Sequence, residues 1–194
     1  GYGAAPGAGH PPGPEKDGEA MKRLILVGGP MGVGKSAVCE ELLRRLEPGV
    51  YLDGDWCWHM SPFSVTEGTK AMVLDNICAL LGRFLRCDEL DNVIFGWVMH
   101  QQEIIDTILS CLPLENVSVK CFSLLASPEA LGRRLERDIR AGRRAEGVIE
   151  RSLAYLPLYQ ELDTMRIDTD GLTPGEAADW IARQVREEGN DGKI

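Results

Sequence analysis

The octapeptide Gly29–Ser36, which reads GPMGVGKS, constrains the fold of this chain more than any other feature of it. It follows a continuous apolar run at residues 24–27, as expected for a strand buried on both faces of a parallel sheet. It opens a segment, residues 35–46, whose apolar side chains recur at helical spacing. A G-x-x-x-x-G-K-S turn between a strand and a helix surrounds phosphate groups with inward-pointing backbone N–H groups. The sequence therefore predicts a nucleotide-binding P-loop.

The chemistry of the side chains in this loop assigns a role to each. The Lys35 ammonium reaches the β- and γ-phosphates, and the Ser36 hydroxyl is a ligand for Mg²⁺. The motif does not distinguish ATP from GTP, and we take ATP as the nucleotide and Mg²⁺ as its metal. The residues predicted to contact the nucleotide are Gly29, Gly32, Val33, Gly34, Lys35, Ser36 and Ala37.

Two carboxylates follow the second predicted strand, which covers residues 50–52. Asp53 and Asp55 stand where that strand delivers side chains to the carboxyl edge of the sheet, the edge at which open α/β folds bind ligands. One carboxylate can hold the metal, and the other can orient or deprotonate an attacking hydroxyl. The alternative is a simple Asp-Gly turn. Asp53 joins Ser36 as a candidate metal ligand, but the spacing leaves open which aspartate takes which role.

Beyond these motifs, short apolar runs alternate with longer segments of helical periodicity. Further strands are predicted at 93–95, 117–125 and 165–168, and helices at 68–86, 101–111, 128–140, 146–162 and 173–186. This alternation predicts βαβ units: a single α/β P-loop domain over 21–194, with a mostly parallel sheet flanked by helices. Half of residues 1–20 are Gly or Pro, so we expect a disordered tail before a candidate start at Met21.

Six arginines gather between residues 133 and 144, a local basic excess in a chain of net charge −9. Phosphoryl transfer needs cations that close over the γ-phosphate, so this region is a candidate lid near 138–148. Arg133 and Arg137 lie one helical turn apart and resemble the arginines of adenylate-kinase-type lids. That resemblance implies that Arg133 contacts the nucleotide and Arg137 takes part in catalysis. The alternative is a solvated basic face with pairs such as Arg134 with Asp138.

Aromatic residues and histidines follow two of the predicted strands at the same edge. Trp56, Trp58, His59 and Phe63 come after the aspartate pair, and Trp97 and His100 follow the third strand. They are candidates to line an acceptor pocket, with core packing as the alternative for the tryptophans and a surface position or a satisfied hydrogen bond for the histidines. The third strand ends Phe95-Gly96-Trp97 without an acidic residue, which leaves the metal to Ser36 and the aspartates.

The composition of the chain limits the classes of molecule that it can bind. The acidic net charge of −9 argues against general binding to nucleic acid or to anionic membranes, and no apolar stretch has the length of a membrane span. None of the cysteines stands in CxxC spacing, and we expect all of them to be free thiols in a reducing cytoplasm, with four packed as small core residues: Cys39, Cys78, Cys111 and Cys121.

Several of these motifs resemble those of small P-loop kinases of the nucleoside- and nucleotide-kinase-like group. Residues 34–38 followed by Tyr51–Asp55 resemble gluconate kinase; Leu-Asp-Gly-Asp also resembles adenylylsulfate kinase, and the Asp-x-Asp spacing resembles shikimate kinase. The later half is similar to the tunicamycin-resistance type of P-loop protein in Leu124–Ser127, Arg134–Arg137 and Ile167–Thr169. The resemblance implies that the Asp-x-Asp serves magnesium and the acceptor hydroxyl. The stretch at 56–63 lacks the residues that mark gluconate, shikimate or adenylylsulfate as acceptor.

The sequence thus predicts an enzyme that transfers the γ-phosphoryl group of ATP to a hydroxyl, or a phosphate, of a small molecule. Its candidate catalytic residues are Lys35, Asp53, Asp55 and Arg137. Two alternatives stay open: a resistance phosphotransferase directed at an antibiotic or a nucleoside, and a nucleotide-binding regulator with little turnover. The missing acid on the third strand favours the regulator. The sequence does not identify the acceptor or the oligomeric state.

Overall fold

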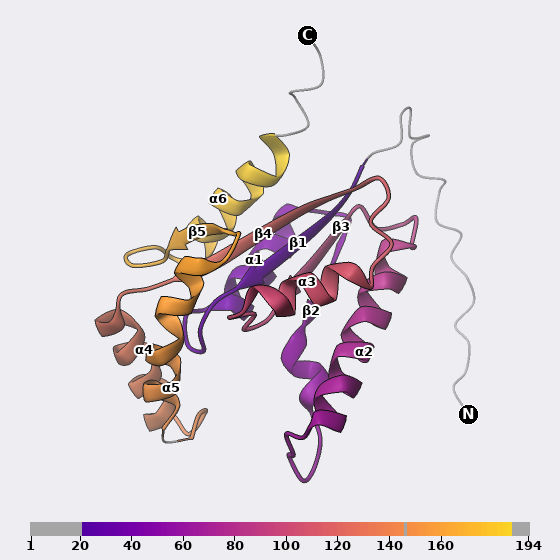
Figure 1. The fold of residues 1–194 in the computed structure, drawn as a ribbon. Coiled ribbons are helices and arrows are strands. Elements are labelled where there is room, and N and C mark those ends of the chain that lie inside the picture. The colour runs from indigo at the N-terminus through magenta and orange to yellow at the C-terminus, as the bar shows by residue number, and fades with distance from the viewer. Residues whose placement is uncertain (1–20, 146, 188–194) are drawn as a thin grey trace, which may run out of the picture.

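A computed structural model describes residues 21–145 and 147–187 of the chain, and the predicted tail at 1–20 lies outside them. Strands and helices alternate along the described part of the chain (Figure 1), as the sequence predicted. The strands are β1 Lys22–Gly28, β2 Gly49–Asp53, β3 Asn92–Gly96, β4 Val117–Leu125 and β5 Met165–Asp168. The helices are α1 Lys35–Arg45, α2 Glu67–Leu85, α3 Gln102–Ser110, α4 Pro128–Arg140, α5 Val148–Tyr155 and α6 Pro174–Glu187, with 3₁₀ turns η1 Gly54–Trp58 and η2 Leu156–Glu161.

The described strands form one parallel sheet in the order β2-β3-β1-β4-β5. β1 lies in the middle and pairs with β3 on one side and β4 on the other, so the P-loop that follows it emerges at the centre of the carboxyl edge. β2 is an edge strand, and its last residue, Asp53, pairs in register with Gly96 at the end of β3. The predicted α/β fold with a parallel sheet is confirmed.

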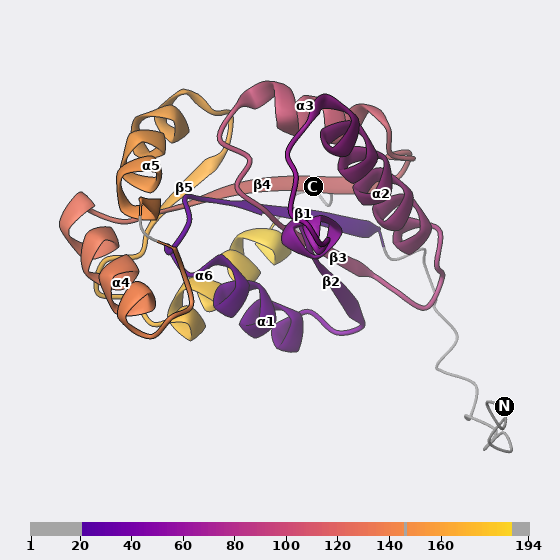
Figure 2. The same ribbon diagram turned by 90° about the horizontal axis from the view of Figure 1, so that it is seen from below.

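Helices cover both faces of the sheet, with α1 and α6 on one face and α2 and α3 on the other (Figure 2). Alternate residues of β1 point to opposite sides: Ile25 and Val27 pack in the core of the α1 and α6 face, and Leu24 and Leu26 pack against α2 and α3. Because both faces are buried, the strand reads as an uninterrupted apolar run.

Most helices begin and end within about one residue of their predicted bounds. A capping box begins α6: the backbone N–H of Thr173 donates to Glu176 Oε2 at 2.8 Å, and Thr173 Oγ1 accepts from the Glu176 N–H at 3.2 Å. The helix predicted over 146–162 is divided instead into α5 and the 3₁₀ turn η2, with Pro157 in the first turn of η2. In the described residues, no helix is both long and apolar enough to cross a membrane.

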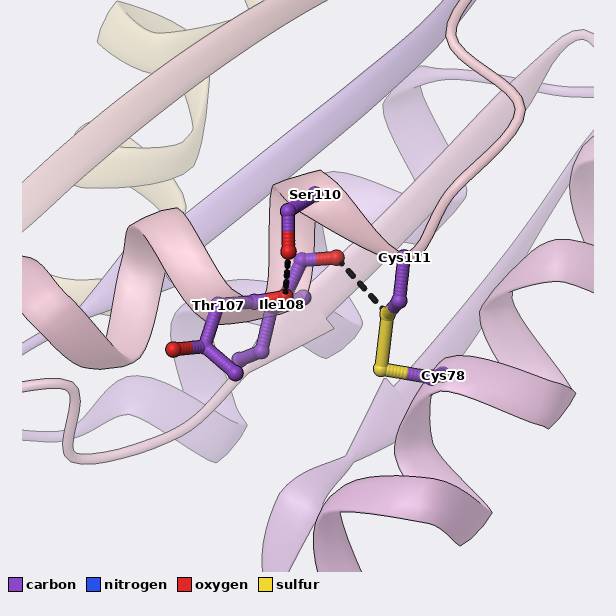
Figure 3. Close-up of a disulfide and its surroundings, with 5 residues drawn as sticks. All are labelled: Cys78, Thr107, Ile108, Ser110 and Cys111. Carbon is purple, nitrogen blue, oxygen red and sulfur yellow. Dashed lines mark hydrogen bonds between the residues drawn. A yellow bond between two sulfur atoms is a disulfide. The ribbon is translucent and has the colours of Figure 1, made fainter.

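The prediction of free thiols throughout is wrong for one pair of cysteines. Cys78 of α2 and Cys111, directly after α3, form a disulfide (Figure 3). The two helices pack side by side on the same face of the sheet, which brings residues 33 positions apart to a Cα–Cα distance of 6.1 Å. Cys111 is exposed rather than packed in the core, whereas Cys39 is fully buried as predicted.

Candidate active site

The P-loop turns tightly between β1 and α1, and its glycines allow close packing. Gly32 has φ +83°, and a Cβ atom there would lie 2.4 Å from Leu135 Cδ2 of α4. Gly34 precedes α1 in the left-handed region, at φ +106°. The loop is therefore seated against α4, with the N-terminus of α1 open for an anion.

Lys35 lies half-buried inside its own loop. Its Nζ donates to the carbonyl oxygens of Gly29 at 2.8 Å and Pro30 at 2.9 Å. Burial lowers the pKa of Lys35 to about 8, and the nearby charge of Asp55 opposes that effect. An anion bound in the loop would favour the charged ammonium, so the side chain is suited to a phosphate ligand.

The aspartate after β2 is held firmly next to the P-loop. Asp53 Oδ2 accepts hydrogen bonds from the Ser36 hydroxyl at 3.0 Å and from the Tyr51 hydroxyl at 3.0 Å. Its Oδ1 accepts from the backbone N–H of Asp55 at 3.0 Å. A hydroxyl and a carboxylate in direct contact are the oxygen donors that Mg²⁺ prefers, and such sites complete the metal's shell with water and phosphate. Ser36 and Asp53 thus fit the predicted metal.

Asp55 is oriented by the turn that begins after Asp53. Gly54 packs against the Trp97 ring so closely that a Cβ atom would lie 2.5 Å from Trp97 Cγ. Asp55 itself is exposed at the mouth of the site. Partial burial of its carboxyl group and the charge of Asp53 raise its pKa, while Lys35 opposes the shift. The raised pKa makes the carboxylate a stronger base.

The end of β3 explains why no third carboxylate is present there. A Cβ atom on Gly96 would lie 3.0 Å from Cys39 Sγ and 3.2 Å from the Tyr51 hydroxyl oxygen. The Tyr51 ring therefore occupies the space that a longer side chain on β3 would need. The Tyr51 hydroxyl donates a hydrogen bond to Asp53. At the carboxyl end of the sheet, the carboxylate therefore comes from Asp53 at the end of β2 and not from β3.

A cavity of about 200 Å³ brings most of the predicted nucleotide and catalytic residues together. It is lined by Met31, Gly32, Gly34, Lys35, Ser36, Ala37, Asp53, Asp55, Gly96, Asp138 and Arg144. Of the other predicted loop contacts, Gly29 accepts the Lys35 hydrogen bond, and Val33 lines a neighbouring cavity of about 310 Å³.

The arginine that lines the P-loop cavity is Arg144, which sequence reasoning did not single out. Asp138 holds it: its carboxylate lies 3.4 Å from Arg144 Nε and 2.7 Å from a terminal nitrogen of Arg143. The Arg143 guanidinium is the chief reason that the pKa of Asp138 is below its usual range. The alternative pairing of Asp138 with Arg134, considered from the spacing, does not form.

Arg134 instead joins three parts of the fold. Its guanidinium donates to the Val33 carbonyl at 3.2 Å, to Thr169 Oγ1 at 3.0 Å and to the Thr169 carbonyl at 3.0 Å. It thereby ties α4 to the P-loop and to the turn after β5. The predicted lid arginines, Arg133 and Arg137, are exposed and line a cavity with Asp170 beside this turn. Arg137 also lines the cavity next to Val33.

The aromatic residues of the edge are partly outside the core. Trp56 is 61% exposed and Phe63 is 67% exposed, so the core-packing alternative fails for Trp56. The Trp56 ring lies 5.7 Å from that of Tyr51.

His100 stacks on Tyr155 of α5 at 4.1 Å, and its Nδ1 is buried without a hydrogen-bond partner among the described residues. Figure 1 shows that η1 and the start of α2 project from the carboxyl edge on one side, and the α4–α5 pair on the other.

A parallel sheet with a P-loop at its centre, an Asp-x-Asp at the end of the edge strand β2 and an arginine-bearing helix pair define a P-loop kinase-like fold. Residues 25–151 match the model of the family described as AAA domain, and the chain belongs to that family. No curated protein matches the chain.

Solved structures share the fold over most of their length. The tunicamycin resistance protein of Deinococcus radiodurans is 22% identical, with a TM-score of 0.61 over 84% of this chain and 96% of that chain. A gluconokinase from Sinorhizobium meliloti 1021 is 19% identical, with a TM-score of 0.63 over 89% and 99%. A sugar kinase from Janibacter sp. HTCC2649 is 15% identical, with a TM-score of 0.63 over 84% and 93%. These are the groups that the sequence motifs resemble.

Proposed function

We propose that the protein transfers the γ-phosphoryl group of ATP to a hydroxyl group of a small molecule. The observation that carries the proposal is the contact of Ser36 with Asp53 in the cavity that Lys35 and Asp55 also line. A P-loop alone serves many reactions, but a second, exposed carboxylate beside the metal ligands provides a place for an acceptor.

We assign different roles to the two aspartates. Both oxygens of Asp53 accept hydrogen bonds from neighbouring groups, so Asp53 suits the metal side with Ser36. Asp55 is exposed and has a raised pKa, so it suits the acceptor. Ser36 and Asp53 would hold Mg²⁺, which when bound would supply positive charge against the negative charge of the triphosphate.

The reaction follows from these placements. The hydroxyl oxygen of the acceptor forms a bond to the γ-phosphorus, and Asp55 accepts the proton of that hydroxyl. The bond between that phosphorus and the β–γ bridging oxygen breaks, and ADP leaves with the electron pair. Lys35 and Arg144 neutralise charge on the phosphate oxygens, while Arg133 and Arg137 lie on the side toward Asp170 and suit the rest of the nucleotide.

A screen of small hydroxyl compounds for ADP release in the presence of Mg²⁺ and ATP tests the proposal. We expect Asp55→Asn to lower the acceptor-dependent rate by about 100-fold or more while ATP binding is retained, the size expected for loss of a general base. Asp88→Asn, an exposed aspartate at the opposite edge of the sheet, is the matched control and should leave both unchanged. Full activity of the Asp55 variant would remove that residue from the mechanism.

The kinase neighbours and the tunicamycin resistance protein leave the acceptor open between a metabolite and an antibiotic or nucleoside. The absence of an acidic residue at Gly96 favours a second candidate, a nucleotide-binding regulator. That role predicts ATP binding, abolished in Lys35→Ala, with no acceptor-dependent ADP release from any compound. Release of ADP that depends on an acceptor and on Asp55 excludes it.

A further inference from the structure

Two tryptophans flank the turn that carries the proposed acceptor carboxylate: the exposed Trp56 follows Asp55 in the chain, and the half-buried Trp97 packs against Gly54. The mostly exposed Trp56 packs on Tyr51, whose hydroxyl binds Asp53. On the other side the Trp97 ring covers Gly54, the residue between the two aspartates. An indole face open to solvent beside the proposed acceptor carboxylate can stack on a ring of a bound compound. We call Trp56 and Trp97 the aromatic rim.

The two segments that carry the aromatic rim have no basic side chains. Neither residues 46–69 nor residues 87–119 contain a lysine or an arginine, although the chain has 21 of them. Recognition of a carboxylate or a phosphate normally relies on Arg or Lys, in a bidentate or point-charge contact. Burial lowers the pKa of His100, so this imidazole is neutral at pH 7. His59 is exposed on the same segment as Trp56.

Two cations of this edge lie in the P-loop cavity, where the proposed nucleotide would bind. Lys35 and Arg144 line the P-loop cavity, and Asp138 holds Arg143 and Arg144. The phosphates of a nucleotide would occupy these groups. Arg151 of α5 is a further exposed cation, which the experiment below tests directly.

We infer that the acceptor is a hydroxyl compound without an anionic group, neutral or amine-bearing, with an apolar ring face that stacks on Trp56. This inference rests on the proposed function and specifies its substrate class. Stacking on the indole would place a hydroxyl toward Asp55, and a protonated amine would gain from the carboxylates and from the π-face of the ring. A carboxylate or phosphate on the acceptor would meet the charge of Asp55 with no compensating cation from the rim segments.

Matched sets of compounds that differ only in charge test the inference. Suitable sets are glucose, glucosamine, gluconate and glucose 6-phosphate, and a nucleoside with its monophosphate, assayed by coupled ADP release. We expect the uncharged or amine-bearing member of the active set to exceed its anionic partner at least tenfold in kcat/KM. A preference for the anionic member would overturn the inference.

The same sets separate this inference from the proposed function. If no compound stimulates ADP release, phosphoryl transfer fails, and the charge rule is then judged by calorimetric binding to the protein loaded with Mg²⁺ and ATP. Tighter binding of the uncharged or amine-bearing member supports the rule. Tighter binding of the anionic member, or no binding of any, overturns it. Sedimentation showing a stable dimer with the Trp56 fluorescence shielded from iodide also overturns it, because a second copy then covers the rim.

Substitutions assign the selectivity to residues. Trp56→Ala should raise the KM of the preferred acceptor about tenfold with little change in kcat, because the acceptor ring loses its stacking partner. Trp56→Arg should shift preference toward the anionic member. Trp180→Phe, which alters a tryptophan that packs on Phe122 across the sheet from α2, is the control and should change neither ratio. An anionic acceptor whose kcat/KM falls in Arg151→Ala would contradict the inference.

Discussion

Gly54 separates the two aspartates because the Trp97 ring leaves no room for a side chain between them. The turn from Asp53 into η1 passes directly over that ring, and the position of Asp55 depends on the contact. The motif that reads as Asp-Gly-Asp in the sequence is therefore a packing requirement as well as a pair of carboxylates. A common turn dipeptide would not need the third partner, Trp97.

Gly54→Ala should accordingly displace Asp55. The added Cβ would lie 2.5 Å from Trp97 Cγ, so the turn or the ring must move, and we expect at least a tenfold loss of acceptor-dependent turnover with a lower melting temperature. Gly132→Ala is the control, since a Cβ there meets nothing within 4 Å and a helical alanine adds about 0.5–1 kcal/mol of stability. Equal activity of both variants would show that Gly54 packing does not set the geometry.

His100 gives the fold a pH dependence whose sign is fixed by burial. Burial lowers its folded pKa below the ordinary value of 6.5, so the unfolded chain binds the proton first as the pH falls. The contribution of His100 to stability is present above about pH 6.5 and is lost as the pH falls below that value. Urea unfolding of the wild type and of His100→Gln at pH 7.5 and pH 5 measures this. The stability advantage of the wild type should shrink at pH 5, and a constant or growing advantage would contradict the assignment.

For single residues, the sequence predicted candidate roles where the role depends on neighbours in the chain, as in the P-loop and the Asp-x-Asp. The P-loop and the Asp-x-Asp are read from spacing alone, because a strand end or a helix start fixes the backbone around them. The six arginines at 133–144 are different, since all have the same local signals. Arg144 reaches the cavity and Arg134 bonds to Thr169 because of how α4 and the following turn pack on the loop. That packing is not encoded in local spacing.

Among the secondary-structure elements, α2 and α3 are joined covalently. Their disulfide closes a loop of 33 residues that contains β3 and the whole of α3. The spacing of the cysteines did not indicate this disulfide, because Cys78 lies within an apolar helical pattern. Cys111 comes near it only because α2 and α3 pack together on the same face of the sheet. Figure 3 shows the disulfide that joins Cys111, at the end of α3, to Cys78 of α2.

Loss of this crosslink should destabilise the protein. Closing a loop of this length contributes about 2–4 kcal/mol, so Cys78→Ser should lower the free energy of unfolding by about that amount, and dithiothreitol should do the same to the wild type. Cys87→Ser, which removes a free thiol at the end of α2, is the control and should respond to dithiothreitol as the wild type does. Mass spectrometry after alkylation without reductant counts the free thiols; six labelled cysteines would show that the disulfide is absent.

The whole molecule is two helical layers on one sheet, and this much follows from the alternation of strand and helix patterns. The strand order does not, since β3 inserts between β1 and β2 and only tertiary packing selects that position. The order matters for the site: β1 carries the P-loop at the centre, β3 ends in Gly96, and the carboxylate comes from the edge strand β2.

Nucleotide binding should stabilise the whole domain, because its ligands come from both halves of the chain. ATP with Mg²⁺ at about 100 times the dissociation constant adds about 2.7 kcal/mol to the free energy of unfolding, or about 5–10 °C in melting temperature for a chain of this size. Differential scanning fluorimetry measures the shift. EDTA should reduce it, because Ser36 and Asp53 then lose the metal that joins them to the phosphates, and Lys35→Ala should abolish it. An unchanged shift in the Lys35 variant would place the nucleotide elsewhere.

Asp138 already provides a negative partner to two arginines, Arg143 and Arg144, and Arg144 lines the P-loop cavity. It acts as a resting counter-ion: Arg143 and Arg144 are neutralised before any nucleotide arrives. Arrival of a triphosphate would then exchange one anion for another at Arg144, so this guanidinium does not pass through an unpaired state. The strength of the Asp138 pairing would set how readily the exchange occurs, and with it the nucleotide concentration at which the site fills.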